Sequence, residues 1–497
     1  MSKSFKILFL YPNEAMSGVA SSNLALLSAY LKHDGFSNVK LFDCFTYKLG
    51  DTQDQVRERL GQVKKSNIDD YVKLKEENIY EDFIKLVDEY QPDLIGTTVM
   101  DSTLELALSF FEKIKDRKIP TIVGGVGATF LHEKILNTGL VDYACIGEGE
   151  EALVELCNKV SNGEDCSQIR NIYTKGTDGK IIKNPLRPLI NLDTILMPDF
   201  SIYEDMLFYR PFRGGVVRTL QFDIDRGCPY GCTYCAAPTL KTLFKDEGCG
   251  NYYRIKNWDK AFAEMKYLIE AYDLNFVWLS SETILAIPDK KFKEFAERYK
   301  REINLPLWCQ SRLDTFTEEK TKLLAEMGCM SMCVGLEHGA ESIRNTLLNK
   351  RMSRERILES IRYIAKNGIA LSVNNMIGLP GETREDVFEG IKLNREIAAI
   401  LGKLFSINAF TFMPFSGTKL RDTCIDKGYI EEDVMSTSFF KNSVLKMPTM
   451  SPEEIRGLER TLLLYVLLPE SYYPDIKIAE TDDEMFQKLM EIKKSII

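Results

Sequence analysis

The stretch "DRGCPYGCTYCAAP", residues 225–238, places three cysteines within eight positions. Three residues separate Cys228 from Cys232, and two separate Cys232 from Cys235. The apolar run 220–224 just before them predicts a strand, so the thiols are expected on the loop that follows it. Glycine and proline residues between the cysteines favour a tight backbone turn, which lets the three sulfurs converge on one side of the loop.

Converging thiols indicate a metal centre. Structural zinc normally takes four protein ligands, and a [4Fe–4S] cluster usually takes four cysteines. A cluster held by three cysteines would leave one iron open to a substrate or a cofactor. The alternative interpretations are a zinc site or a chance grouping of cysteines.

The composition is that of a globular protein with more than one domain. The chain has 497 residues, 44% hydrophobic and 28% charged, with a formal net charge of −9. This acidity disfavours nucleic acid as a partner. The start "MSKSFKILFLYPNE" has too short an apolar run for a signal peptide, and no later run reaches membrane-spanning length. We expect a cytoplasmic protein without a membrane span, whose twelve cysteines are ligands or buried thiols.

Strand and helix patterns alternate through the first third of the chain. Short apolar runs at 6–11, 39–42, 94–99, 119–123 and 143–146 predict buried parallel strands. We expect a Rossmann-like, doubly wound α/β sheet that binds ligands at the carboxyl ends of its strands.

Two segments interrupt this rhythm. Residues 51–82 are rich in charge and are predicted to form a helical insertion on the surface. Residues 171–215 contain several prolines and the hairpin signal Asp178-Gly179, and they are interpreted as a linker. The predicted organisation is a first domain at 1–170, this linker, a second domain at 216–415 and a small, mainly helical region at 416–497.

The second domain repeats the alternation. Its predicted strands are 220–224, 276–279, 307–310, 332–336, 370–376 and 406–412. Six βα units indicate a partial (β/α)6 barrel with its active site at the carboxyl ends of the strands.

The cysteine spacing resembles the C-x3-C-x2-C signature of radical S-adenosylmethionine (SAM) enzymes. Tyr234 supplies the aromatic residue usual just before the third cysteine. The resemblance implies a [4Fe–4S] cluster on Cys228, Cys232 and Cys235, with SAM chelating the open iron. One electron then cleaves SAM to methionine and a 5′-deoxyadenosyl radical, which abstracts hydrogen from the substrate.

Later stretches resemble the SAM-binding motifs of the same family, in the expected order. "SSE" stands where the family has Gly-Gly-Glu, and two serines replace the glycines. "CQSRLD", "CVGLEHGAESI", "MIGLPGET" and "MPFSGTKL" resemble the motifs of the following strands, with His338 in place of the usual serine. The resemblance implies these SAM-binding residues: Tyr234, Ser281, Glu282, Arg312, Glu337, Gly378 and Leu379.

The first domain lacks Gly-x-Gly-x-x-Gly and a Walker A lysine, and its loops instead resemble cobalamin-binding domains. "GTTVMDS", "VGGVGAT" and "IGEGEEAL" follow the third, fourth and fifth predicted strands. The resemblance implies these cobalamin-binding residues: Pro12, Asn13, Thr97, Thr98, Ser102, Gly124, Gly125, Gly147 and Glu148.

One motif of histidine-ligated cobalamin enzymes, Asp-x-His-x-x-Gly, is missing after the first strand, where the loop reads "YPNEAMSGVASS". His33 and His132 are predicted to be surface or packing residues, so no histidine is expected under the cobalt. The alternative is a domain that no longer binds cobalamin.

Together the motifs resemble the cobalamin-binding radical SAM family. The resemblance implies methylation of an unactivated carbon or phosphorus centre in a small-molecule or peptide substrate, with an electron donor such as flavodoxin or ferredoxin. Radical cyclisation or ring rearrangement without methyl transfer, a radical SAM enzyme without cobalamin, and an iron–sulfur sensor or carrier remain alternatives.

The remaining cysteines, including the pair Cys329 and Cys333, are interpreted as buried thiols, and a second iron–sulfur cluster stays an open alternative. No catalytic residue is predicted.

Overall fold

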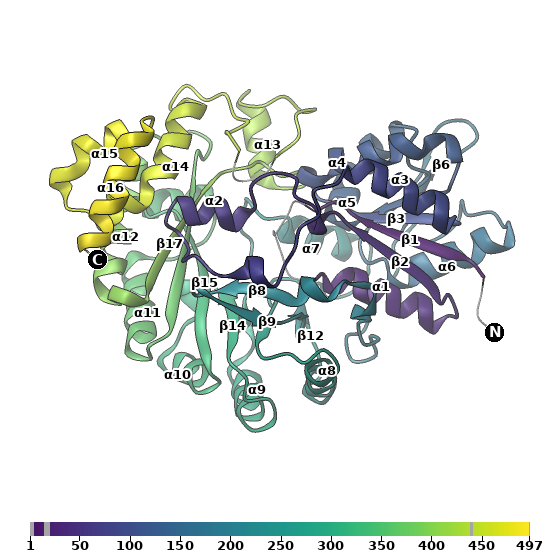
Figure 1. Cartoon of the computed structure of the whole chain (residues 1–497), viewed down its shortest axis with the longest axis horizontal. Helices are drawn as coiled ribbons and strands as arrows, with labels where there is room; N and C mark the ends of the chain where they lie inside the picture. The colour runs from purple at the N-terminus through teal and green to yellow at the C-terminus, as the bar shows by residue number, and fades with distance from the viewer. Residues whose placement is uncertain (1–3, 14–19, 438–440, 497) are drawn as a thin grey trace. The chain divides into compact units, whose positions relative to one another are not determined.

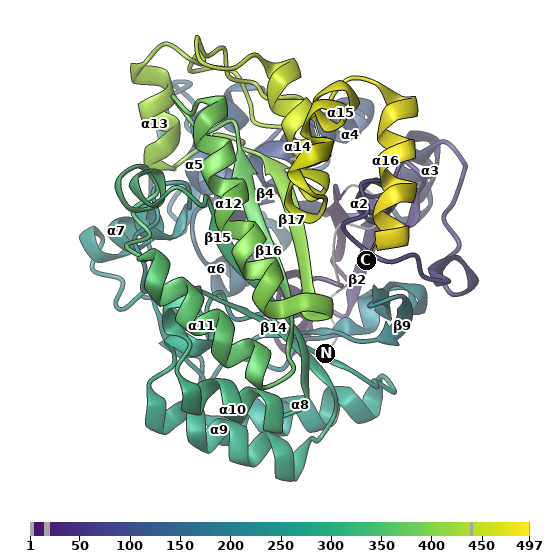
Figure 2. The ribbon, with the colours of Figure 1, turned by 90° about the vertical axis from the view of Figure 1, so that its left-hand side faces the viewer.

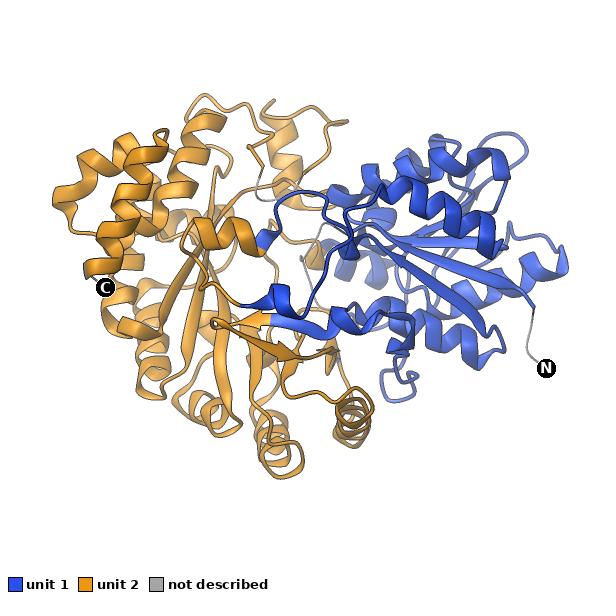
Figure 3. Cartoon of the chain, viewed as in Figure 1, with its two compact units in different colours: residues 1–53, 67–210, 239–254 blue, residues 54–66, 211–238, 255–497 orange. Residues whose placement is uncertain are grey.

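The structure is a computed structural model that describes residues 4–13, 20–437 and 441–496. The chain divides into two compact units (Figure 3). The N-terminal unit contains residues 1–53, 67–210 and 239–254, and the C-terminal unit contains residues 54–66, 211–238 and 255–497. Among the described residues, no helix is both long enough and apolar enough to cross a membrane.

The N-terminal unit is built on one seven-stranded sheet (Figure 1). Its strands, in the order β2-β1-β3-β4-β5-β6-β7, are β1 (Lys6–Tyr11), β2 (Asn38–Asp43), β3 (Leu94–Thr98), β4 (Thr121–Gly124), β5 (Tyr143–Cys145), β6 (Ile172–Lys175) and β7 (Ile181–Ile182). The first five strands are parallel, whereas β6 and β7 join antiparallel. The predicted Rossmann-like sheet and its five strands are confirmed.

Helices cover both faces of this sheet, as a doubly wound fold requires. The main ones are α1 (Ser22–His33), α3 (Ile79–Tyr90), α4 (Asp101–Ile114), α5 (Gly125–Asn137) and α6 (Glu150–Asn162). Helix α1 contacts α6, and α3 contacts α4 on the opposite face. Covered on both faces, β1 is apolar without alternation, and Ile7 to Leu10 are fully buried.

The two interrupting segments differ from the sequence-based expectation. Only α2 (Gln53–Arg59), a short 3-10 turn at Ile68–Asp70 and the start of α3 are helical within 51–82, so the prediction of one helical stretch is wrong. The segment interpreted as a linker contributes β6 and β7 to the sheet. The hairpin signal at Asp178-Gly179 is confirmed, because Gly176 N–H donates to the carbonyl of Lys180 across the turn between these strands.

The C-terminal unit contains a six-stranded parallel sheet in sequence order, which confirms the partial barrel. Its strands are β10 (Gln221–Phe222), β13 (Val277–Leu279), β14 (Leu307–Ser311), β15 (Cys329–Glu337), β16 (Ala370–Ile377) and β17 (Phe405–Thr411). The helices between them are α8 (Trp258–Ala271), α9 (Asp289–Glu302), α10 (Glu318–Glu326), α11 (Arg354–Lys366) and α12 (Arg384–Leu401), of which α11 and α12 lie in front of the strands in Figure 2.

Shorter elements complete the chain. They are β8 (Tyr209–Phe212), β9 (Gly215–Arg218), β11 (Asp225–Arg226), β12 (Arg254–Ile255) and α7 (Ala237–Asp246). The C-terminal region is helical, as predicted, with α13 (Lys419–Asp426), α14 (Pro452–Leu467), α15 (Tyr473–Ala479) and α16 (Asp483–Ile496). Helix α14 packs against β17 and α12.

The two faces of the barrel strands differ in polarity. On β15, Met332, Val334 and Leu336 are buried on the face covered by helices. Cys333 and Glu337 alternate with them and lie on the concave face. Polar groups on that face and at the carboxyl ends of the strands therefore form the candidate site.

Candidate active site of the C-terminal unit and cofactor edge of the N-terminal unit

The three cysteines of the opening motif are half-buried on the loop between β11 and α7. Each sulfur has a polar neighbour. Arg312 Nη1 donates to Cys232 Sγ at 3.2 Å, and the N–H of Ala237 donates to Cys235 Sγ at 3.4 Å. Cys228 Sγ lies 4.0 Å from the Thr283 hydroxyl. Such donors stabilise negative charge on sulfur, which suits thiolates that ligate iron.

The donor set fits an iron–sulfur cluster better than a single ion. Among the described residues, no three His, Cys, Asp or Glu side chains converge on one ion. A four-iron cluster instead places each cysteine on its own iron, so its thiolates stand farther apart. Burial raises the pKa of the Cys228 thiol, and it raises the pKa of Cys235 to about 12, so metal binding must displace their protons.

Arg312 connects the cysteine loop to the rest of the site. It lies at the end of β14, as the sequence predicts, and is largely buried. Besides Cys232, its guanidinium donates to both carboxylate oxygens of Asp314 at 3.0 Å and to the carbonyl of Lys350 at 2.6 Å. It also lies over the ring of Tyr230, 4.0 Å from the centroid. These contacts fix a positive charge beside the second cysteine.

Three side chains, those of Tyr234, Glu337 and Lys350, form a hydrogen-bonded group beside the cysteine loop. The Tyr234 hydroxyl donates to Glu337 Oε1 at 3.0 Å. Lys350 Nζ lies 3.2 Å from the same oxygen and 3.1 Å from the Tyr234 hydroxyl. Burial, and then the charge of Glu337, raise the pKa of Tyr234 well above its ordinary value, so the hydroxyl stays protonated. Sequence reasoning found Tyr234 and Glu337 but missed Lys350, which follows no strand motif.

The backbone at the end of β15 is shaped for this cluster. Glu337 has φ of 66°, and the strand register shifts between Gly335 and Glu337. The carboxylate folds back over Gly335, where a Cβ atom would overlap Glu337 Oε1. A side chain at position 335 would therefore displace the carboxylate from Tyr234 and Lys350.

The two residues predicted after the second barrel strand behave differently from one another. Ser281 is fully buried, and its hydroxyl donates to Asp225 Oδ2 at 2.7 Å, so it braces the start of the cysteine loop. Glu282 is exposed, although the surrounding protein and then Asp223 raise its pKa. Of Ser281 and Glu282, only Glu282 has a side chain that can reach the ammonium group of a ligand.

Gly378 and Leu379 lie in a turn that is organised by Glu382. Their N–H groups donate to Glu382 Oε2 at 2.6 and 2.9 Å. His338 Nε2 lies 2.8 Å from Glu382 Oε1, and both side chains are buried. The backbone donors of this turn are therefore used within the protein. The Leu379 side chain is fully buried in the hydrophobic core, and its carbonyl accepts from the N–H of Glu382, so this turn is held mainly by contacts within the protein.

The nine predicted cobalamin positions lie at the carboxyl edge of the N-terminal sheet, because they follow β1, β3, β4 and β5, which are adjacent strands. Thr98 pairs with Gly124 across β3 and β4. Thr97 Oγ1 is buried and has no hydrogen-bond partner among the described residues. A buried hydroxyl without a partner at this edge fits a ligand that brings a polar group.

Packing within the N-terminal unit explains why one of the two glycines at the end of β4, Gly125, carries no side chain. Gly125 has φ of 90°, and a Cβ atom there would lie 2.6 Å from Thr98 Oγ1 and 2.8 Å from the carbonyl oxygen of Val99. At Gly124 the nearest atoms to a Cβ lie 3.8 Å away, so this position leaves space above the sheet. Gly124 is thus the glycine of the pair that is open to a ligand.

Gly147 and Glu148 are engaged within the N-terminal unit. A Cβ atom at Gly147 would lie 2.8 Å from the ring of Phe244. The Glu148 carboxylate accepts hydrogen bonds from Arg254 Nη2 at 2.5 Å and from the N–H of Ile190 at 2.8 Å. Glu148 therefore holds the segment 239–254 in this unit, a role that the sequence did not indicate.

The two histidines of the first domain lie away from the strand ends. His33 is exposed at the end of α1. His132 packs edge-on against Tyr173 at 5.0 Å, and burial lowers its pKa. Of the loop after β1, Pro12 is buried, and the N–H of Asn13 donates to the carbonyl of Tyr11. Residues 14–19 of that loop lie outside the described residues.

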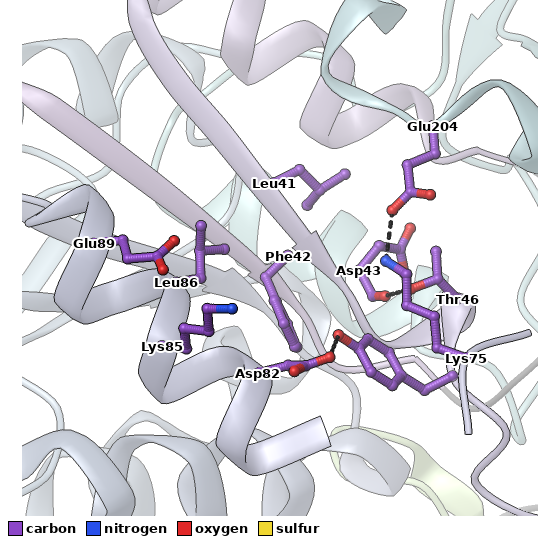
Figure 4. A pocket seen from close by; sticks show the side chains of 11 residues that line it. Leu41, Phe42, Asp43, Thr46, Lys75, Asp82, Lys85, Leu86, Glu89 and Glu204 are labelled. Atoms are coloured by element: carbon purple, nitrogen blue, oxygen red, sulfur yellow. Dashed lines mark hydrogen bonds and ion pairs between the residues drawn. The ribbon is translucent and has the colours of Figure 1, made fainter. Parts of the chain in front are cut away.

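A pocket of about 270 Å³ opens beside the carboxyl end of β2 (Figure 4). It is lined by Leu41, Phe42, Asp43, Thr46, Tyr47, Lys75, Asp82, Lys85, Leu86, Glu89 and Glu204. Burial raises the pKa of Asp43 to about 7. The ion pair of Lys75 with Glu204 and the hydrogen bond from Tyr47 to Asp82 hold the rim. None of the nine predicted cobalamin positions lines this pocket.

The other cysteines do not form a second cluster-like motif. Cys329 and Cys333 point to different neighbours. Cys329 Sγ lies 3.9 Å from Cys309 Sγ on the helix side of the sheet, whereas Cys333 faces the concave side. Of the nine cysteines outside the motif, eight are buried, as predicted, and Cys333 is half-buried.

Comparison with known proteins supports both halves of this description. The family model of the radical SAM superfamily matches residues 224–393, and that of the B12 binding domain matches residues 19–157. An anaerobic magnesium-protoporphyrin IX monomethyl ester cyclase of Rubrivivax gelatinosus is 26% identical, covering 91% of this chain and 80% of the relative. An uncharacterized methyltransferase of Pyrococcus horikoshii is 25% identical, covering 81% and 85%.

The fold is also shared with a solved structure. The radical SAM methyltransferase TsrM of Kitasatospora setae, with cobalamin and a [4Fe–4S] cluster bound, matches with a TM-score of 0.65. The match covers 99% of this chain and all of TsrM at 17% identity. The chain is a radical SAM enzyme. With its B12 binding domain ahead of the radical SAM domain, it belongs to the cobalamin-binding radical SAM family, and its cofactors are a [4Fe–4S] cluster, SAM and cobalamin.

Proposed function

We propose that the protein methylates an unactivated carbon or phosphorus centre of a small-molecule or peptide substrate. The observation that carries this proposal is the joining of the cysteine loop to Glu337 through Arg312, Lys350 and Tyr234 at the carboxyl ends of the barrel strands. When bound, the cluster, SAM and cobalamin supply one-electron cleavage of SAM and a transferable methyl group.

The residues of the chain have distinct parts in this proposal. Cys228, Cys232 and Cys235 hold the cluster and leave one iron open. Arg312 keeps a positive charge 3.2 Å from Cys232 Sγ, which stabilises the reduced cluster. Glu282 offers a carboxylate to the ammonium of SAM.

Glu337 acts beside the SAM ribose, held in place by Tyr234 and Lys350. The turn at Gly378 and Leu379 lies against adenine. In the N-terminal unit, Thr97, Thr98, Ser102 and Gly124 line the cobalamin edge together with Pro12, Asn13, Gly125, Gly147 and Glu148.

The proposal also includes an electron donor, a cellular compartment and the exclusion of nucleic acid as substrate. A reduced flavodoxin or ferredoxin delivers the electron, and the reaction takes place in the cytoplasm, where the thiols stay reduced. The net charge of −9 supports a substrate other than nucleic acid.

The test uses anaerobically purified protein reconstituted with iron, sulfide and hydroxocobalamin, then supplied with SAM and a reductant. Methyl transfer predicts S-adenosylhomocysteine that depends on cobalamin, together with 5′-deoxyadenosine. SAM carrying a deuterated methyl group should label the product.

The second candidate is radical cyclisation without methyl transfer, which the similarity to the Rubrivivax gelatinosus cyclase favours. It predicts 5′-deoxyadenosine without S-adenosylhomocysteine and without label in the product. Labelled product would exclude it, and its absence alongside radical cleavage of SAM would exclude methyl transfer.

A further inference from the structure

Residues 54–66 form a strap that belongs to the C-terminal unit, although they lie between two strands of the N-terminal sheet in sequence (Figure 3). Val56 and Leu60 pack into the hydrophobic core that α14 and α16 share with β17. Gly61 has φ of 69°, and a Cβ atom there would lie 3.1 Å from the side chain of Leu463. Close packing therefore fixes the strap against the barrel.

The strap places Arg57 on the concave face of the barrel. Arg57 Nη2 donates to Asn408 Oδ1 at 2.9 Å. Asn408 lies in the middle of β17, and its amide donates to the Ser372 hydroxyl and to Asn374 Oδ1, both at 2.8 Å. Ser372 pairs with Cys333 on β15, so this thiol lies beside the group. Burial raises the pKa of the Cys333 thiol to about 12, and the charge of Arg57 opposes this rise.

The guanidinium has donors to spare. Its Nε is buried and has no hydrogen-bond partner among the described residues. Asp54 forms an ion pair with the guanidinium, but its Oδ1 lies 3.6 Å from Nη1, which is beyond hydrogen-bond distance. A guanidinium presents five N–H donors in a planar fork that matches a carboxylate or a phosphate. A buried N–H without an acceptor beside a polar cluster is what a bound oxyanion would complete.

Position along the strands relates this group to the proposed chemistry. Asn408 pairs with Asn374 on β16, and Asn374 pairs with Gly335 on β15, so Arg57 is bound at the level of Gly335, two residues before Glu337. Trp278 and Trp308 stack at 4.0 Å on the neighbouring strands β13 and β14. The register places Gln310 beside Cys333, so Trp308, two residues earlier, lies on the same concave face.

We propose that Arg57, which Asn408 holds in place, binds an anionic group of the substrate, a carboxylate or a phosphate, with the Ser372 hydroxyl as a second donor. The inference rests on the proposed function and names a class of substrate for it. The acidic group of the substrate would then lie deeper on the concave face than Glu337, which stands at the carboxyl end of β15.

The experiment measures binding rather than turnover, on the reconstituted protein. Fluorine NMR compares 4-fluorobenzoate with its neutral analogue 4-fluorobenzamide at millimolar concentrations, with inorganic phosphate as a competitor. The variants are Arg57→Gln and Arg57→Lys. Arg59→Gln is the matched control, because Arg59 is exposed on the same helix.

The wild type and Arg59→Gln should broaden the fluorobenzoate signal, and Arg57→Gln should bind at least about tenfold more weakly. Arg57→Lys should restore part of the affinity, which shows that charge rather than folding was lost. Displacement by phosphate assigns the site to any oxyanion, and failure of displacement assigns it to carboxylates.

Equal binding by wild type and Arg57→Gln, equal binding of benzoate and benzamide, or no binding by the wild type would overturn the inference. If binding depends on Arg57 but no labelled product forms, only the methyl-transfer proposal fails.

Discussion

Glu382 organises the turn that carries Gly378 and Leu379, and removing its carboxylate tests that role. In Glu382→Ala, two buried N–H groups lose their acceptor. Each buried donor without a partner costs about 1–3 kcal/mol, so we expect a local loss of about 4 kcal/mol.

Glu382→Gln should cost less, for a reason that the geometry supplies. The N–H of Ala340 donates to His338 Nδ1 at 3.0 Å, so Nδ1 is an acceptor and Nε2 carries the ring hydrogen. A glutamine has one carbonyl oxygen, which can face either the two backbone N–H groups or Nε2–H of His338. In either orientation its NH₂ group faces a donor on the other side, so one side of the side chain loses its hydrogen bonding. We therefore expect a loss of about 2 kcal/mol.

The assay is hydrogen exchange of the peptide that contains residues 378–383, followed by mass spectrometry. A loss of about 4 kcal/mol should speed local exchange by about a thousandfold in Glu382→Ala. Glu385→Gln serves as the control, because Glu385 is exposed in the first turn of α12. Unchanged exchange in Glu382→Ala, or equal losses in the Ala and Gln variants, would refute the assignment of this turn to Glu382.

Three further predictions concern single side chains of the C-terminal unit. Arg312→Gln removes a positive charge and a donor from Cys232 Sγ, so the reduction potential of the cluster should become more negative in spectroelectrochemistry, and Arg312→Lys should recover part of the shift. Glu459 is buried on α14, and burial raises its pKa to about 7 from an ordinary value of 4.5. The folded state therefore binds the proton more tightly than the unfolded state does, and stability falls as the pH rises from about 4.5 to about 7. Glu459→Gln should remove this loss, up to about 3 kcal/mol, and flatten melting temperature against pH; parallel wild-type and variant curves would contradict it. Leu60→Ala should destabilise the C-terminal unit by about 2 kcal/mol in thermal melting, whereas a surface strap would tolerate it.

The regular elements could be predicted because their signals are local. Apolar runs such as 6–11 and 307–310 become strands, and Asp178-Gly179 becomes a hairpin turn. The cysteine spacing identifies the loop that binds the cluster. The later radical SAM motifs then show which strand ends lie at the same edge of the sheet as this loop. That alignment is how Tyr234 and Glu337, more than a hundred residues apart, could be placed in one site.

The missed residues depend on contacts between distant segments. Lys350 follows no strand, and only the fold brings it to Glu337 and Tyr234. The charged stretch 51–82 has a weak apolar pattern, so the packing of Leu60 into the C-terminal core left no local signal. Arg57 belongs to the same stretch, which was predicted as a whole to lie on the surface. A motif also does not show which of its groups the protein itself uses, as Ser281 and Glu148 illustrate.

The role of the three cysteines is tested most directly by iron content and SAM cleavage in a variant that combines Cys228→Ala, Cys232→Ala and Cys235→Ala. The control is Cys329→Ala, which removes a buried thiol on the helix side of the sheet. The wild type and the control should bind about four irons and form 5′-deoxyadenosine, and the triple variant should lose both. A triple variant that keeps its iron and still forms 5′-deoxyadenosine would contradict that role.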